Sequence, residues 1–269
     1  MPSTSRKANG IEIYYEIHGS GSPLVLIAGL GYPAWEWHKM VPLLSEQFMV
    51  ITFDNRGVGL TEKPAGPYTA ALLAADLAGL LDELGLEKAI IMGHSMGGFI
   101  AQAFALEYPQ RVSKLILCST NFGGPNHVPI SAEAMQVLAD TRSEPLTRFT
   151  NGLIISTAPG FAENHPEIIQ EWKEWRLANP LHAAGYQAQF AIGLGLLNPD
   201  AAFEQKLDQV SSPTLIIFGA HDKVVPPANA ELLAHQINGS KIVILPDAGH
   251  FFPIETPQAA AEVVIAFAR

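Results

Sequence analysis

The chain has 269 residues, of which 48% are hydrophobic and 16% are charged, a composition that excludes a disordered chain and favours a well-buried core. Sixteen Lys and Arg against 26 Asp and Glu give a formal net charge of −10, which disfavours nucleic acid as a partner. The one cysteine, Cys118, cannot form an intramolecular disulfide and leaves no cysteine cluster for zinc. These features indicate an enzyme-sized globular protein of a reducing, cytoplasmic compartment.

The first ten residues contain no apolar stretch typical of a secretion signal, which also favours a cytoplasmic protein. Two uncharged stretches, Ala89 to Leu106 and Leu177 to Pro199, reach the length of a membrane span. The first is interrupted by three glycines, and the second carries Asn, Gln and Pro residues. We therefore expect no membrane span and no membrane partner.

Apolar and polar residues alternate from Ile11 to Ile17, and a turn-rich segment, residues 19–23, leads into the apolar run Leu24 to Ile27. This pattern predicts a hairpin that enters a buried strand. Short apolar runs then alternate with helical patterns, which predicts a parallel sheet with right-handed crossovers. The elements expected in this part are strands at Val50 to Phe53, Ala89 to Met92 and Leu115 to Cys118, and helices at about Thr69 to Leu84 and about Ser95 to Glu107.

The alternation stops between about Asn121 and Lys206, where several helical patterns occur, among them Pro166 to Leu177. We interpret this segment as a helical cap inserted over one edge of the sheet. A packing excursion with no role in binding is the alternative. The predicted organisation is a core of residues 1–120 and 207–269 with a cap of residues 121–206. The elements expected after the cap are strands at Thr214 to Phe218 and Ile242 to Leu245, and helices near Asn229 to His235 and about Pro257 to Ala268.

The sequence Gly93-His94-Ser95-Met96-Gly97-Gly98 fits the pattern G-x-S-x-G between a predicted strand and a predicted helix. A sharp turn there would expose Ser95 at the carboxyl end of the strand, and the glycines are needed because side chains would collide with neighbouring elements. Ser95 would lie at the start of a helix, where the N–H of Met96 can stabilise an oxyanion. We predict that Ser95 is a nucleophile, although the bare pattern also arises by chance.

A nucleophilic serine needs a histidine base and a carboxylate that orients the base. Among the nine histidines, His250 follows the predicted strand Ile242 to Leu245 and its turn, so it lies on a loop at the carboxyl end of that strand. His94 is the alternative base, but its place inside the turn beside Ser95 favours a packing role. We therefore predict His250 as the base.

The acid should also follow a strand. Asp222 lies just beyond the predicted strand Thr214 to Phe218, whereas no carboxylate directly follows the strand that ends at Cys118. Asp247 is the alternative, but it is only three residues from His250, a short path for two side chains that must meet head-on. We predict Asp222 as the acid, and the order Ser95, Asp222, His250 is that of α/β-hydrolases rather than of the chymotrypsin or subtilisin folds.

Two further loops follow predicted strands. In Ala28-Gly29-Leu30-Gly31-Tyr32 the glycines let the backbone turn toward the nucleophile, and the N–H of Leu30 is the candidate second oxyanion donor. A glycine-rich connection without catalytic use is the alternative. In the segment from Asp54 to Gly59 we expect a rigid turn in which Asp54 and Arg56 make structural hydrogen bonds. The segment is not a phosphate loop, because it lacks the lysine and the spacing of that motif.

These motifs together resemble those of the α/β-hydrolase superfamily, over nearly the whole chain outside the predicted cap. They are Gly29-Leu30-Gly31, Asp54-Asn55-Arg56-Gly57-Val58-Gly59, Gly93-His94-Ser95-Met96-Gly97-Gly98, Gly219-Ala220-His221-Asp222 and Gly249-His250-Phe251. The resemblance implies an α/β-hydrolase fold, with a mostly parallel central sheet, helices on both faces and an inserted helical cap. Within the superfamily the chain is similar to small bacterial esterases and lactonases, including 3-oxoadipate enol-lactonases and cofactor-free haloperoxidase-like perhydrolases.

The chain departs from some relatives at two places. Many have His-Gly where this chain has Ala28-Gly29, a change that removes a side chain which often braces the oxyanion loop but leaves the backbone donor. Epoxide hydrolases and haloalkane dehalogenases of this architecture use an aspartate nucleophile, so Ser95 argues against both activities.

The expected function is hydrolysis of small to medium carboxylic esters or lactones through an acyl-enzyme on Ser95, without a metal or organic cofactor. A small-molecule substrate is the only partner expected, and the oligomeric state is not predicted. Alternatives that stay open are a carbon–carbon bond hydrolase or a perhydrolase with the same triad, and a small-molecule receptor that retains the triad. Candidate pocket residues are Met135, Leu138, Trp172, Trp175, Phe190, Leu194 and Val224.

Overall fold

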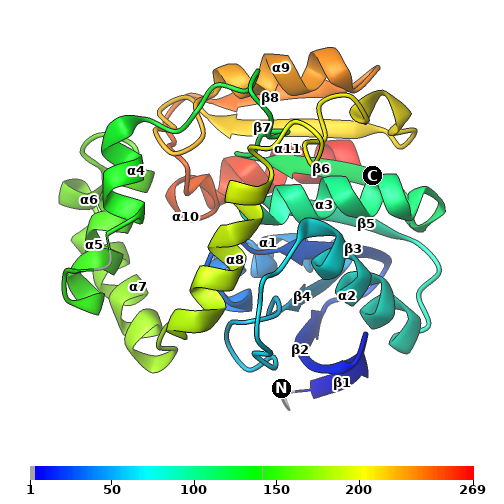
Figure 1. The fold of residues 1–269 in the computed structure, drawn as a ribbon, viewed down its shortest axis with the longest axis horizontal. Coiled ribbons are helices and arrows are strands. Elements are labelled where there is room, and N and C mark those ends of the chain that lie inside the picture. Colours follow the sequence, from blue (N-terminus) through cyan, green and yellow to red (C-terminus); the bar gives the residue numbers. More distant parts are fainter. Residues whose placement is uncertain (1–3, 141) are drawn as a thin grey trace.

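A computed structural model describes residues 4–140 and 142–269. Its centre is an eight-stranded sheet with the strand order β1-β2-β4-β3-β5-β6-β7-β8 (Figure 1). The pairs from β4 to β8 are parallel, whereas β1 and β2 are antiparallel to their neighbours, so the expected mostly parallel sheet is confirmed. The strands are β1 (Thr4–Ala8), β2 (Ile11–His18), β3 (Ser22–Ile27), β4 (Phe48–Phe53), β5 (Ala89–His94), β6 (Val112–Cys118), β7 (Thr214–Gly219) and β8 (Lys241–Leu245).

The predicted hairpin between β2 and β3 is wrong. β2 pairs with β1 through a turn at Asn9 and Gly10, both at positive φ, and its other edge pairs with β4. β3 lies instead between β4 and β5. The physical reason is burial: β3 is apolar on both faces and takes a central place, whereas the alternating β2 suits a position near the edge.

Helices cover both faces of the sheet, as expected. Val25 and Ile27 of β3 pack in one cluster with α2 (Ala70–Glu83), α3 (Met96–Glu107) and α9 (Ala228–Gln236). Leu24 and Leu26, which alternate with them, pack in a second cluster on the opposite face. Helices of that second face are α1 (Val41–Leu44), α10 (Phe252–Glu255) and α11 (Pro257–Ala268).

Within the described residues, five α-helices lie between β6 and β7. Figure 1 shows α4 to α7 gathered to one side of the sheet, with α8 between them and the core. Trp172 of α7 is fully buried against Trp35 and Phe251 of the core, so the segment is packed on the rest of the chain. Among the described residues, no helix has the length and apolarity needed to cross a membrane. The five are α4 (Ala132–Leu138), α5 (Pro145–Ser156), α6 (Phe161–Asn164), α7 (Pro166–Ala178) and α8 (Ala183–Gly195), and short 3-10 helices occur at Ala34–Trp37, Pro109–Arg111 and Leu207–Gln209.

Candidate active site

Ser95 lies in a sharp turn between β5 and α3. Its backbone angles, φ 55° and ψ −119°, belong to a region that non-glycine residues rarely adopt. The turn is tight on both sides, because a Cβ on Gly93 would lie 2.2 Å from the carbonyl oxygen of Gly97, and one on Gly97 would lie 2.2 Å from that of Ile27. The N–H of Ser95 donates to the carbonyl of Cys118 at the end of β6 (2.9 Å). This arrangement leaves the Ser95 side chain partly exposed at the carboxyl end of the sheet.

Asp222 and His250 form a hydrogen-bonded pair at the same end of the sheet. His250 Nδ1 lies 2.8 Å from Asp222 Oδ2, and both residues are 4% exposed. Asp222 Oδ1 accepts from the N–H groups of Val224 (2.9 Å) and Val225 (2.7 Å), which fixes the carboxylate. A histidine that donates from Nδ1 to a carboxylate has Nε2 available as a base.

The loops that carry this pair pack backbone against backbone. The N–H of His221 donates to the carbonyl of Ala248 (2.9 Å). A Cβ on Gly219 would lie 2.1 Å from the carbonyl oxygen of Gly249. Since β7 and β8 are also neighbours in the sheet, the distance between the two side chains is set by main-chain contacts. Asp247, the alternative acid, is exposed to solvent.

The loop after β3 reaches Ser95. A Cβ on Gly29 would lie 3.4 Å from the Cβ of Ser95. Within the described residues, the N–H groups of Leu30 and Met96 have no acceptor. Gly31 is held from both sides, since its N–H donates to Gln189 Oε1 of α8 and its carbonyl accepts from Arg176 Nη2 of α7, each at 2.9 Å.

His94, the alternative base, is fully buried and both of its ring nitrogens are engaged. Nδ1 lies 2.5 Å from Glu36 Oε1, and Nε2 lies 2.8 Å from the main-chain carbonyl oxygen of His250. Burial lowers the pKa of His94, but the neighbouring Glu36 carboxylate, together with the His250 carbonyl and the Asp222 charge, raises it above its ordinary value. Glu36 has no neighbours in the chain that mark it as a buried partner of His94.

The turn that begins at Asp54 has the structural role expected for it. Asp54 accepts from the N–H groups of Ala34 and Leu60, both at 2.7 Å, and burial raises its pKa to about 6. The Arg56 guanidinium makes two hydrogen bonds to the buried Asp76 carboxylate. The turn therefore braces the segment that follows the Gly29 to Gly31 loop.

A family model described as "alpha/beta hydrolase fold" matches residues 22–257. The chain belongs to this family. A protein named 3-oxoadipate enol-lactonase 2 from Acinetobacter baylyi is 29% identical over 94% of this α/β-hydrolase chain and 91% of its own length. A proposed carbamate hydrolase, RutD, of Azorhizobium caulinodans is also 29% identical, over 95% of this chain and 94% of its own. The structure of a thermophilic esterase from Thermogutta terrifontis superimposes with a TM-score of 0.82 at 31% identity, covering 100% of this chain and 98% of that one.

The residues predicted for a pocket of this α/β-hydrolase lie in different surroundings. Trp172 is fully buried in an aromatic cluster, with its ring 5.0 Å from that of Trp35, so the structure favours core packing for it. Met135 and Leu194 are 39% and 51% exposed, because they lie on outer helix faces. Trp175, 39% exposed, stacks on the Trp35 ring. The other members are Leu138 and Phe190, which are half-buried, and Val224, which is buried beside Asp222.

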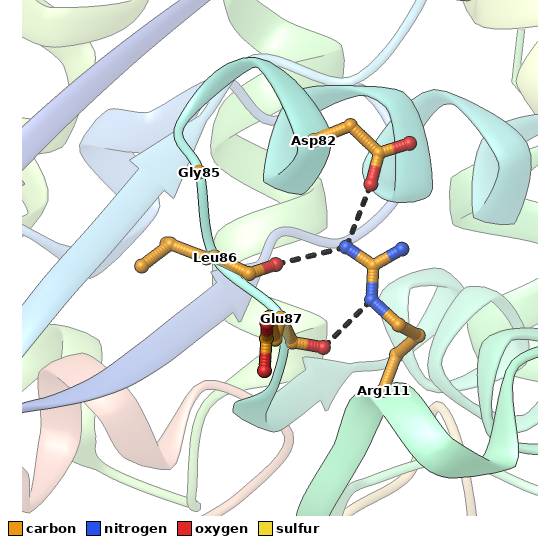
Figure 2. Close-up of a pocket in the computed structure, with 5 residues that line it drawn as sticks. All are labelled: Asp82, Gly85, Leu86, Glu87 and Arg111. Carbon is orange, nitrogen blue, oxygen red and sulfur yellow. Dashed lines mark hydrogen bonds and ion pairs between the residues drawn. The ribbon is translucent and has the colours of Figure 1, made fainter.

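A surface depression of this α/β-hydrolase lies at the opposite, amino-terminal ends of β5 and β6, lined by Asp82, Gly85, Leu86, Glu87 and Arg111. Figure 2 shows Arg111 there, aimed at the chain that links α2 to β5. Its guanidinium donates to the carbonyls of Leu86 (2.9 Å) and Glu87 (2.7 Å) and pairs with Asp82 (2.8 Å). These contacts give Arg111 a structural role away from the candidate site.

Proposed function

We propose that this α/β-hydrolase is a serine hydrolase that cleaves carboxylic esters or lactones of small to medium size. Ser95 is the nucleophile, His250 the general base and Asp222 the residue that orients the base. The observation that carries the proposal is the 2.8 Å contact between His250 Nδ1 and Asp222 Oδ2, at the sheet end where the strained turn presents Ser95.

The mechanism has two half-reactions. Ser95 Oγ attacks the substrate carbonyl while His250 Nε2 takes its proton, and the N–H groups of Leu30 and Met96 donate to the oxyanion that forms. His250 then protonates the leaving alkoxide. Water, activated by the same histidine, attacks the acyl-enzyme and releases the acid. No step of this mechanism requires a metal or an organic cofactor.

We further propose that residues 121–206 form a cap on a core made of residues 1–120 and 207–269. Supporting contacts come from three places in this segment: Arg176 and Gln189 bond to Gly31, and the carbonyl of Ser156 accepts from the N–H of Phe251 (3.0 Å) beside His250. The segment therefore contacts both the loop after β3 and the histidine loop, which supports a role in shaping an acyl or alcohol pocket. The pocket residues predicted in this segment from the sequence remain predictions.

The three relatives named above support chemistry at an acyl carbonyl, since their names refer to an ester, an enol-lactone and a carbamate. One acyl-enzyme mechanism serves all three groups, because an ester or a carbamate ester releases its alcohol and an enol-lactone its enol, the carbamate leaving a carbamoyl group on the serine. Carbamates are therefore a second substrate class to test beside esters and lactones. No described residue of this site specifically favours the carbon–carbon hydrolase, perhydrolase or receptor alternatives.

The test is turnover of p-nitrophenyl esters from acetate to palmitate by the wild type and by Ser95→Ala, with p-nitrophenyl carbamates as a second panel. We expect wild-type turnover that falls as the acyl chain lengthens, and a loss of at least about a thousandfold in Ser95→Ala. Turnover by Ser95→Ala close to that of the wild type would remove Ser95 from the mechanism. Turnover restricted to carbamates would replace the proposed substrate class.

A further inference from the structure

A buried carboxylate lies behind the candidate site, between three of its segments. Glu36, on the 3-10 helix Ala34–Trp37, has no solvent exposure. Its Oε2 accepts from the N–H of Gly29 (2.7 Å), and its Oε1 faces His94 Nδ1. The other ring nitrogen of His94 reaches the carbonyl oxygen of His250. We call this chain of contacts, from Gly29 through Glu36 and His94 to His250, the Glu36–His94 bridge.

Both ring nitrogens of His94 are engaged by oxygen atoms of the bridge. Both ring nitrogens of His94 face oxygen acceptors, so both hydrogen bonds form together only when each nitrogen carries hydrogen or when the proton is shared with Glu36. The other ionisable groups near the ring are the Asp222 carboxylate and the His250 imidazole, 4.7 Å away between ring centroids. The rings of Trp37, Phe251 and Phe252 also pack around it.

Each end of the bridge is next to a proposed catalytic group. Gly29 precedes Leu30, the proposed oxyanion donor, and His94 precedes Ser95. The third contact is the main chain of the proposed base itself. Asp222 fixes the His250 side chain, whereas the bridge fixes the His250 backbone relative to the nucleophile and the oxyanion loop.

We propose that Glu36 and His94 are positioning residues, which hold the base and the oxyanion loop at the correct distance from Ser95. The inference rests on the proposed function. A displacement of catalytic groups by about 1 Å can lower a rate by about a hundredfold, so losing the bridge should lower kcat far more than it changes KM.

Three variants separate positioning from general destabilisation. Glu36→Ala removes the bridge, and we expect kcat for a p-nitrophenyl ester to fall on the order of a hundredfold with KM within about threefold. Glu36→Gln can rebuild it, because the amide oxygen can accept from Gly29, the amide N–H can donate to His94 Nδ1, and His94 Nε2–H can donate to His250. We therefore expect Glu36→Gln to recover most of the kcat that Glu36→Ala loses.

Arg111→Ala is the control, since it removes structural hydrogen bonds and an ion pair at the opposite, amino-terminal ends of β5 and β6. We expect it to lower the melting temperature but to change kcat less than about threefold. Equal kcat losses in Arg111→Ala and Glu36→Ala, or a Glu36→Ala enzyme with wild-type kcat, would overturn the positioning role.

A proton NMR experiment reports on the bridge without turnover. The short contact between His94 Nδ1 and Glu36 should give a low-field resonance that disappears in Glu36→Gln and persists in Asp222→Asn. Its absence from the wild type would overturn the bridge. A wild type that shows this resonance but has no Ser95-dependent turnover would instead contradict the proposed function, and with it any catalytic use of the bridge.

Discussion

At the scale of single residues, Ser95 has backbone angles that mostly glycine adopts. The residues on either side of it explain why the strained turn forms. Gly93 and Gly97 leave no room for a side chain, so packing holds the strained residue in place. The sequence predicts Ser95, Asp222 and His250 because each follows a strand within a local pattern. Glu36 could not be predicted, since it lies 58 residues from His94 and only the folded chain brings them together.

The strain at Ser95 can be measured by comparing two variants that both lack the hydroxyl group. We expect Ser95→Gly to be more stable to urea than Ser95→Ala by about 1–3 kcal/mol, because only glycine adopts the φ of 55° without steric cost. The comparison cancels the loss of the hydroxyl. Equal unfolding free energies would mean that the turn relaxes and stores no strain.

Asp222 should matter for the tautomer of His250 rather than for folding alone. In Asp222→Asn the amide oxygen can keep the bonds to Val224 and Val225, which turns the amide N–H toward His250 and favours the wrong tautomer. We expect kcat to fall by about 10³ to 10⁴, by analogy with the same change in a serine protease triad. Asp247→Asn, at the exposed alternative, should retain kcat within about threefold. A reversed result in steady-state ester hydrolysis would assign the acid to Asp247.

At the scale of elements, the expected core strands and helices agree with the observed ones to within a few residues. Continuous apolar runs predict buried strands well, because both faces of this sheet are covered. The wrong prediction of a hairpin shows the limit of such patterns, because β2 pairs with β4 and not with β3, which follows it in the chain. Of the five α-helices described between β6 and β7, only Pro166–Ala178 was located closely from the sequence, because apolar residues such as Leu146, Ile154 and Leu194 are exposed here and do not mark a buried face.

The close approach of α3 to β3 makes a testable element-scale claim. Gly97→Ala would place a Cβ 2.2 Å from the carbonyl oxygen of Ile27, so the helix and strand must separate. We expect a loss of about 1–3 kcal/mol in urea unfolding, together with a lower kcat because Ser95 moves with α3. Gly152→Ala, in the middle of α5 with open space around it, should instead raise stability by about 0.5–1 kcal/mol. Similar changes in unfolding free energy for the two substitutions would contradict the close approach of α3 to β3.

At the scale of the whole molecule, Glu255 of α10 joins the segment between β6 and β7 to the histidine loop. It accepts from the N–H of Ala158 (2.6 Å) on one side and from that of Gly249 (3.0 Å) on the other. Burial raises its pKa from 4.5 to about 7. The folded chain therefore binds this proton more tightly than the unfolded chain does, and protonation favours folding.

The sign of this effect fixes a pH dependence of stability. The contribution of Glu255 is fully present below pH 4.5 and is lost as the pH rises through about 7. We measure the free energy of unfolding with urea between pH 5 and pH 8. As the pH rises over this range, we expect the value for the wild type to fall relative to that for Glu255→Gln by up to about 3 kcal/mol. A difference that is constant over this range, or that grows in favour of the wild type, would contradict the raised pKa.

The central claim is that Ser95 forms a covalent acyl-enzyme. The most direct measurement is reaction of the wild type with a fluorophosphonate, which modifies activated serines, followed by peptide mass spectrometry. We expect one phosphonyl adduct, on the peptide that contains Ser95, which is absent from Ser95→Ala and much slower to form in a His250→Ala variant. A folded wild type that forms no adduct, or an adduct that maps to another residue and persists in Ser95→Ala, would contradict the central claim.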